Sequence, residues 1–299
     1  MKKVVGLGAC VLDTLIECDT FPKEDTKYKA NNVVRTGGGP VANALVVVAK
    51  FGLQAEFIGA LSKDAEGCFL KDELTRYNVK TDNVVQIENT RAFTSYILLS
   101  KQSGSRSCVF ERGNIPDSEK NVCFSAMDDA DVLHLDGNNL HSAIACAKYA
   151  KQKGVAVSLD AGGLYNGIEE LLPYVDVLIT SEEFALGYTK CENTRDAILL
   201  LEKKYSPKIL AVTQGAKGGL YVENGEVKNW KGFTVQCVDS NGAGDTFHGA
   251  FLAAYLKGYD VENCCKIASA TSAIKCTKVG MRDALPNFEE TLQFINERS

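Results

Sequence analysis

The chain has 299 residues, with 33 Lys and Arg against 38 Asp and Glu, and a formal net charge of −5. Its content of 45% apolar and 24% charged residues excludes intrinsic disorder, collagen and coiled coils, and is typical of a globular protein with a substantial core. The acidic balance argues against nucleic acid as a partner, because such surfaces are basic.

The eleven cysteines are scattered, odd in number and without a Cys-x-x-Cys pair. This usage favours reduced thiols in a cytoplasmic protein over a disulfide scaffold. No apolar run approaches the roughly 18 residues of a membrane-spanning helix, so the sequence predicts no membrane partner.

Short apolar runs alternate with helical patterns along most of the chain. Strands buried on both faces are predicted at 4–7, 55–58, 132–135, 156–159, 175–179 and 209–212. Helices are predicted between them at 41–51, 66–77, 140–153 and 194–205, and in the C-terminal part at 243–257, 261–277 and 287–298. This alternation indicates an α/β fold with a mostly parallel central sheet flanked by helices. Ligands of such sheets bind at the carboxyl ends of the strands.

Two segments, 14–36 and 92–112, break the alternation. The second predicts strands at 93–100 and 107–112 joined by the turn Ser103-Gly104-Ser105. Together the segments predict a small antiparallel β lid outside the main sheet, with an edge extension of that sheet as the alternative. A hairpin is predicted around Asn224-Gly225. Because the sequence shows no linker or repeat, we expect a single domain over 1–299.

The segment 239–245 reads Asp-Ser-Asn-Gly-Ala-Gly-Asp, between the strand-like run 234–238 and a helical pattern. The small residues Gly242, Ala243 and Gly244 let the backbone approach a ligand and direct N–H groups at an anion at the helix N-terminus. Asp245 either caps this helix or accepts a proton from an alcohol during phosphoryl transfer.

A second cluster, Gly37-Gly38-Gly39, precedes a helix with Asn43 in its first turns. It lacks the Gly-Lys-Ser/Thr of a P-loop, so phosphate is not its predicted ligand. The cluster either brings backbone and an amide against a polyhydroxylated ligand or forms a tight turn capped by Asn43.

Two motifs, Gly-Gly-x-x-x-Asn at 38–43 and Asp-x-x-Gly-Ala-Gly-Asp at 239–245, resemble signatures of the ribokinase-like (PfkB) carbohydrate kinases. The resemblance runs nearly the whole length, and the stretches at 11–13, 22–25, 103–106 and 237–239 look most like the ketohexokinases within that family. It implies a three-layer ribokinase-like sandwich with a β lid and an ATP-dependent kinase that phosphorylates a primary hydroxyl of a monosaccharide.

The resemblance also implies roles for individual residues. Asp245 is the implied catalytic base, with Gly242, Ala243 and Gly244 as the anion hole. The implied sugar contacts are Asp13, Asp25, Gly38, Gly39 and Asn43. The implied nucleotide contacts are Thr213, Gly215, Gly218 and Gly280. ATP and Mg²⁺ are the implied cofactors, and K⁺ is a further candidate at Asp239 and Asn241. Glu183, or alternatively Glu182, is expected to act on Mg²⁺ through water, unless both are simply acidic residues at a helix N-terminus.

Two departures from the family pattern concern the substrate and the metal. Gly39-Pro40 stands where a sugar-binding asparagine of ketohexokinases falls, and Ser181-Glu182-Glu183-Phe184 replaces the family's Asn-x-x-Glu. The resemblance implies a ketohexose such as fructose, or ribose, as the acceptor. A nucleoside kinase of the same fold and a catalytically silent sugar or nucleotide sensor are the alternatives. The resemblance implies a homodimer through the lid, and for His248 packing is favoured over catalysis.

Overall fold

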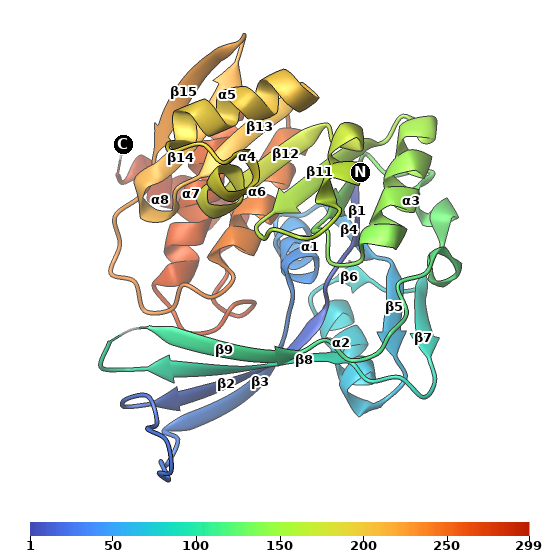
Figure 1. Cartoon of the computed structure of the whole chain (residues 1–299). Coiled ribbons are helices and arrows are strands. Elements are labelled where there is room, and N and C mark those ends of the chain that lie inside the picture. The colour runs from blue at the N-terminus through green and yellow to red at the C-terminus, as the bar shows by residue number, and fades with distance from the viewer. Residues whose placement is uncertain (104, 299) are drawn as a thin grey trace.

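The structure is a computed structural model that describes residues 1–103 and 105–298. Its centre is a nine-stranded sheet in the order β15-β14-β13-β12-β11-β10-β1-β4-β6 (Figure 1). The strands are β1 (Lys3–Leu7), β4 (Gln54–Phe57), β6 (Val79–Lys80), β10 (Val132–Leu135), β11 (Ala156–Ala161), β12 (Val177–Ser181), β13 (Ile209–Thr213), β14 (Gly218–Glu223) and β15 (Glu226–Lys231). All neighbours from β13 to β6 pair in parallel, and β14 and β15 form an antiparallel edge.

Helices cover both faces of this sheet, which confirms the predicted α/β sandwich. One face carries α1 (Pro40–Lys50), α6 (Ala243–Leu256), α7 (Val261–Cys276) and α8 (Phe288–Asn296). The other carries α3 (Leu140–Lys153), α4 (Glu182–Thr189) and α5 (Thr194–Tyr205). Alternate side chains of one strand enter different layers, since Val4 packs in the first and Val5 in the second.

A smaller, separate sheet in the order β3-β2-β8-β9 projects from the main body. Its strands are β2 (Val11–Cys18), β3 (Asn32–Gly38), β8 (Phe93–Ser100) and β9 (Arg106–Glu111). The outer pairs are antiparallel and the central pair, β2 with β8, is parallel. This confirms the predicted small sheet outside the main one and excludes the edge-extension alternative. Helix α2 (Ala65–Arg76) lies beside the lid's attachment, next to the short pair β5 (Gly59–Ser62) and β7 (Val84–Ile87).

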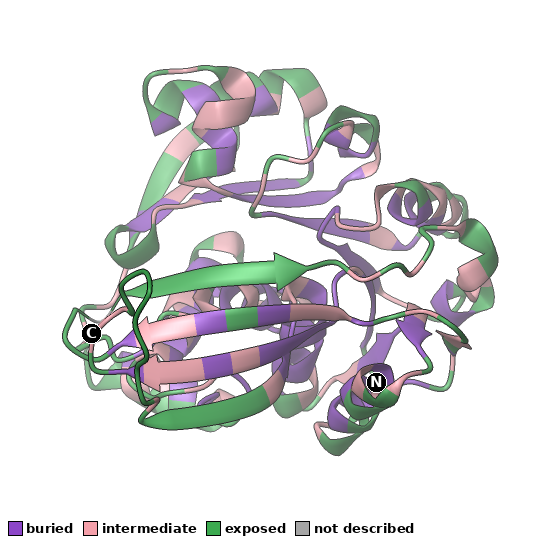
Figure 2. Cartoon of the chain, turned by 60° about the horizontal axis from the view of Figure 1, so that its bottom comes forward, coloured by how far each residue is buried: buried purple, intermediate pink, exposed green. Residues whose placement is uncertain are grey.

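The two faces of the lid differ because side chains alternate along each strand. Asp13 of β2 pairs in register with Ser95 of β8, and both side chains are buried. Tyr96 and its β9 partner Val109 occupy the opposite face and are 52% and 68% exposed. The edge strand β9 is exposed along its whole length (Figure 2).

The structure corrects several sequence-based boundaries. Residues 234–238 form no strand, although Thr and Val favour one, because the segment leaves the sheet edge after β15 and bonds instead to the end of α7: the N–H groups of Val238 and Asp239 donate to the carbonyl of Cys276 at 2.8 and 3.1 Å. The strand predicted at 175–179 begins at Val177, after a short 3₁₀ turn at 172–174. Gly104 of the predicted lid turn lies outside the described residues.

Helix α4 and the short strands β5, β6 and β7 were not expected from the sequence. Each is too short to show a clear hydrophobic period. Over the described residues, no helix combines the length and the apolar character required to cross a membrane.

Candidate active site

The segment 242–245 forms the N-terminus of α6, where the sequence predicted an anion hole. Gly242 is the N-cap residue in the left-handed region, with φ 73°, and a Cβ there would lie 2.4 Å from Cγ of Met281. No side chain caps the helix, and a Cβ on Gly244 would meet open space. No N-cap side chain covers this end of α6, as an anion-binding helix end requires, although the N–H of Ala243 donates to the carbonyl of Ser240 at 3.3 Å.

Asp245 lies in the first turn of α6 and is half-buried. Its Oδ2 accepts a hydrogen bond from Nδ2 of Asn43, on α1, at 2.7 Å. Burial raises the pKa of Asp245, the charge of Asp160 raises it further, and the bond from Asn43 opposes the rise. The structure thus joins two motifs, whose bonded residues are 202 positions apart, into one cluster around a carboxylate with a raised pKa.

Asp13 belongs to the same cluster. Its Oδ1 accepts a hydrogen bond from Oγ of Ser95 at 2.5 Å. Burial raises the pKa of Asp13 to about 6, against the Ser95 bond, and the nearby charge of Asp245 adds to the rise. Gly38 completes the contact, because a Cβ there would lie 2.0 Å from Oδ2 of Asp13.

Gly39 turns the chain into α1 with φ 97°, and a Cβ there would lie 2.3 Å from the carbonyl oxygen of Ala9. Glycine is therefore required at both positions. Asp25 is not brought to this cluster: it lies in the exposed connection beyond the far ends of β2 and β3 (Figure 1). Its predicted contact with the sugar stays a prediction.

A buried ion pair supports the glycine cluster from behind, and sequence reasoning missed it. Arg282 is 1% exposed; its Nε donates to Oδ1 of Asn43 at 3.1 Å and its Nη1 to Oε2 of Glu73 at 2.7 Å. The same Glu73 oxygen accepts the N–H of Gly37 at 2.5 Å. Asn43 is thus held from both sides, with its amide fixed toward Asp245. The sequence offers no pattern that would identify this ion pair, because Arg282 is a single charged residue outside any helical or strand pattern.

A cavity of about 330 Å³ opens next to the N-terminus of α6. It is lined on one side by the predicted nucleotide residues Thr213, Gly215 and Gly218, and on another by Ala243 and Gly244 of the anion hole. Its remaining lining residues are Ala216, Gly232, Phe233, Thr234, Val235, Cys237, Ser240, Phe247, Ser269, Ser272, Ala273 and Cys276. The largely apolar wall beside a row of helix N–H groups suits a ligand with an aromatic base and phosphates.

Gly280 does not line this cavity; its N–H donates to Oδ2 of Asp239 at 3.0 Å. The other oxygen of Asp239 accepts the N–H of Asn241 at 2.8 Å. The two residues assigned to a monovalent cation are therefore adjacent, and they tie the start of the 239–245 segment to the chain that follows α7.

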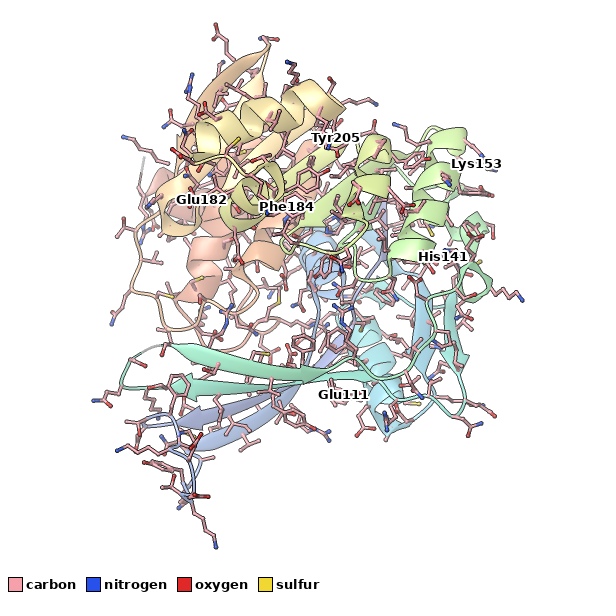
Figure 3. All side chains as sticks on the ribbon, viewed as in Figure 1. Glu111, His141, Lys153, Glu182, Phe184 and Tyr205 are labelled. Atoms are coloured by element: carbon pink, nitrogen blue, oxygen red, sulfur yellow. The ribbon has the colours of Figure 1, made fainter. Side chains whose placement is uncertain are left out.

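The two acidic residues at the start of α4, Glu182 and Glu183, lie in different surroundings. Glu182 accepts hydrogen bonds through Oε1 from Thr194 at 2.5 Å and Gln214 at 2.6 Å, and these bonds hold the pKa of Glu182 below its usual range. Figure 3 shows Glu182 in the layer formed by α4 and α5. Glu183 is exposed. Across the residues that the structure describes, no three His, Cys, Asp or Glu side chains converge on one metal position, so the assignment of Glu183 stays a prediction.

His248 is buried on α6, three residues after Asp245. Its Nε2 lies 3.1 Å from Oδ1 of Asp160 on β11, and its ring centroid lies 5.7 Å from that of His134. It contributes to the buried polar network whose Asp160 charge raises the pKa of Asp245.

A second cavity, of about 220 Å³, adjoins the lid. Phe93 lines it, two residues before Ser95 and on the same face of β8 as Ser95. Arg112 and Asn138 also line it, with the guanidinium of Arg112 5.7 Å from the centroid of the Phe93 ring.

Comparison with known proteins assigns this chain to a family. The model of the pfkB family carbohydrate kinases matches residues 1–287. The chain is 27% identical to a ribokinase of Haemophilus influenzae over 302 residues, which cover 98% of each chain. It is 27% identical to an ATP-dependent ribose-1-phosphate kinase of Halopiger xanaduensis, over 100% of this chain and 99% of the other.

Solved structures agree with this match. The ribokinase of Arabidopsis thaliana, solved with ribose and ATP, superposes with a TM-score of 0.85 at 26% identity and covers 99% of each chain. A protein of the same fold from E. coli, solved with ATP and Mg²⁺, gives a TM-score of 0.87 at 20% identity, over 99% of this chain and 100% of the other. Because the family model spans nearly the whole chain, this protein belongs to the pfkB family of carbohydrate kinases, which are phosphotransferases acting on sugar hydroxyls.

Proposed function

We propose that this enzyme transfers the γ-phosphoryl group of ATP to a primary hydroxyl of a free monosaccharide, a ketohexose such as fructose or else ribose. One observation carries the proposal: the cavity of about 330 Å³ ends at the uncapped N-terminus of α6, where the carboxylate of Asp245 is bonded to Asn43. A nucleotide in that cavity presents its terminal phosphate to the helix N–H groups and to the acceptor that Asp245 deprotonates.

In this reaction Asp245 accepts the proton of the acceptor hydroxyl, whose oxygen then attacks the γ-phosphorus while the bond to the β-phosphate oxygen breaks. The N–H groups at the start of α6 stabilise the charge of the transferred group. Asp13 and Ser95 orient the sugar through its other hydroxyls. The lid excludes water, a competing acceptor, and Nη1 of Arg106 on β9 joins it to the rim of the nucleotide cavity through Oγ of Ser240 at 3.0 Å.

Mg²⁺ would supply positive charge that neutralises the phosphates of the nucleotide. Glu183 is our candidate for holding one of those waters. We assign the reaction to the cytoplasm, which supplies ATP and keeps thiols reduced, since all eleven cysteines of the chain are free.

A nucleoside acceptor is the second candidate. The cavity beside Phe93 supports it, because an aromatic ring at the end of the acceptor site provides a surface for a base. Tyr96 does not add to this surface, because it lies on the opposite face of the lid and is exposed. The carboxylate of Asp13 favours a bare sugar, whose several hydroxyls donate hydrogen bonds to it.

The test is an ADP-release assay with ATP and Mg²⁺ over a panel of fructose, ribose, other free sugars and nucleosides, with melting temperatures measured in parallel. We expect the highest kcat/KM for a free ketohexose or for ribose. Faster turnover of adenosine would favour the nucleoside kinase. A raised melting temperature without ADP release from any compound would favour the sensor and reject the kinase proposal.

We further propose that the lid pairs with a second copy of this chain. Val33, Tyr96 and Val109 share the lid face opposite Asp13 and are all more than half exposed, at 55%, 52% and 68%. Apolar side chains gathered on a sheet face mark an association surface.

A further inference from the structure

Lys275, near the C-terminus of α7, is a lysine with no exposed surface. Its Nζ donates to the carbonyl oxygen of Asp239 at 2.8 Å and lies 3.7 Å from Oδ2 of the same residue. Burial lowers the pKa of Lys275, and the charges of Asp239 and Asp245 oppose this effect. Because an ammonium group is costly to remove from water, its place in the fold calls for an explanation.

The ammonium contacts Asp239, one of the two residues at which the family resemblance implies a monovalent cation. K⁺ is held in proteins by carbonyl and carboxylate oxygens, and Asp239 presents both kinds. Those oxygens have partners already: the carboxylate accepts the N–H groups of Asn241 and Gly280, and the carbonyl accepts Nζ of Lys275. The residues present do not fit an additional K⁺, since a second positive charge would lie beside the first.

The same helix fixes both ends of the anion-hole segment. Lys275 holds Asp239 at its start, and Oγ of Ser272, one turn earlier on α7, donates to the carbonyl oxygen of Ala243 at 2.9 Å. Between these two contacts lies the Gly242 turn that directs the N–H groups of α6. A positive charge at Asp239 therefore orders the backbone that stabilises the transferred phosphoryl group.

We propose that the ammonium of Lys275 is a built-in replacement for a monovalent cation, so that this enzyme binds nucleotide and turns over without K⁺. Lys275 is a positioning residue: it touches Asp239, and acts on the phosphoryl site through the segment 239–244. The proposal concerns the nucleotide side only, so it holds whichever sugar or nucleoside is the acceptor.

The experiment compares the wild type with Lys275→Ala and Lys275→Gln in KCl, NH₄Cl, NaCl and tetramethylammonium chloride at equal ionic strength. ADP affinity by calorimetry and melting temperature are the main readouts, because neither needs an acceptor. ADP release with the best acceptor is the third. Lys3→Ala is the matched control: Lys3 is another buried lysine, on β1, whose Nζ bonds the Ala126 carbonyl at 3.0 Å and lies 2.9 Å from Glu56.

We expect the wild type to give the same values in all four salts. Lys275→Ala should bind ADP roughly tenfold more weakly in tetramethylammonium chloride, as loss of a charged hydrogen bond predicts, and K⁺ or NH₄⁺ should restore most of the affinity and melting temperature by entering the vacated position. Lys3→Ala should lose melting temperature equally in every salt.

Three results would overturn the proposal. The first is a several-fold gain in wild-type ADP affinity or turnover in KCl over tetramethylammonium chloride. The second is an ADP affinity of Lys275→Ala that equals that of the wild type in all four salts. The third is a folded Lys275 variant that neither K⁺ nor NH₄⁺ restores. If the alanine variant does not fold in any salt, Lys275→Gln, which keeps a hydrogen-bond donor but no charge, decides between the same outcomes.

Discussion

The carboxylate of Asp245 accepts a hydrogen bond from the neutral amide of Asn43, and the cation Arg282 contacts Asn43 rather than Asp245. This arrangement suits a general base, because an amide donor fixes the carboxylate without lowering its pKa as strongly as a direct ion pair would. Burial and the charge of Asp160 raise the pKa of Asp245, which increases its affinity for the proton of the acceptor hydroxyl.

We predict that Asp245→Asn lowers kcat at least about a hundredfold, since removal of a general base costs this much, while the sugar Kd changes little. Steady-state ADP release and calorimetry with the best acceptor check both values. Asp82→Asn, an exposed carboxylate between β6 and β7, is the control and should be silent. Turnover of Asp245→Asn near that of the wild type would reject its assignment as the base.

Asp13 gives a prediction for pH. Its folded-state pKa of about 6 exceeds the ordinary value of 3.8, so the folded protein binds this proton more tightly than the unfolded chain. The contribution of this protonation to the free energy of unfolding is fully present below about pH 4 and is lost as the pH rises through about 6. Asp13→Asn removes this dependence. We therefore expect the melting temperature of Asp13→Asn minus that of the wild type to be larger at pH 7.5 than at pH 4. Thermal unfolding of both proteins at both pH values measures this difference.

That comparison has a second arm. Asp13→Asn should also weaken sugar binding, because a neutral amide accepts hydroxyl hydrogen bonds less strongly than a carboxylate does. A melting-temperature difference independent of pH would contradict the raised pKa, whereas unchanged sugar affinity would contradict the contact.

At the scale of elements, the buried Glu73–Arg282 pair connects α2, the glycine cluster and the chain after α7. Glu73 reaches both Arg282 and the N–H of Gly37, and Arg282 reaches Asn43 on α1. Three segments far apart in the sequence therefore share one charge pair, which aligns the acceptor side of the site with Asp245.

We predict that Glu73→Ala destabilises the fold by about 3 kcal/mol, because it leaves the Arg282 guanidinium buried without its carboxylate. The matched control on the same helix is Glu66→Ala, whose pair with Arg35 is 3.5 Å long with partners 36% and 59% exposed. Such surface pairs contribute about 0 to 1 kcal/mol. Urea unfolding measures both variants, and similar losses for the two would argue against the role of the buried pair.

At the scale of the whole molecule, the lid has a cleft-facing side with Asp13 and an outer side with exposed apolar residues. We predict that Val109→Glu, alone or with Tyr96→Glu, yields a monomer where the wild type is a dimer, since a charge in an apolar interface is costly to bury. Light scattering coupled to gel filtration gives the mass, and Leu199→Glu on α5, 41% exposed in the wild type, is the control. A monomeric wild type would remove the basis of the proposal.

The sequence alone determined the α/β class, most of the longer helices and strands, the presence of a small second sheet and the segment 242–245, because strand runs, helical periods and glycine turns are local properties of the chain. The helix start at Gly242 and the uncapped N–H groups follow from four consecutive residues. Asp13 and Asn43 could be assigned only through the family resemblance, since a single polar residue at a strand or helix end has an ordinary local explanation.

Only the tertiary structure decided which groups meet. It brought Asn43 to Asp245, placed Arg282 behind Asn43, and put the ammonium of Lys275 against Asp239, where the sequence suggested K⁺. It also separated Glu182 from Glu183 by their partners. The physical reason is that hydrogen bonds and ion pairs act over a few ångströms between residues that lie from 12 to 239 positions apart in the sequence, and no period along the chain records such distances.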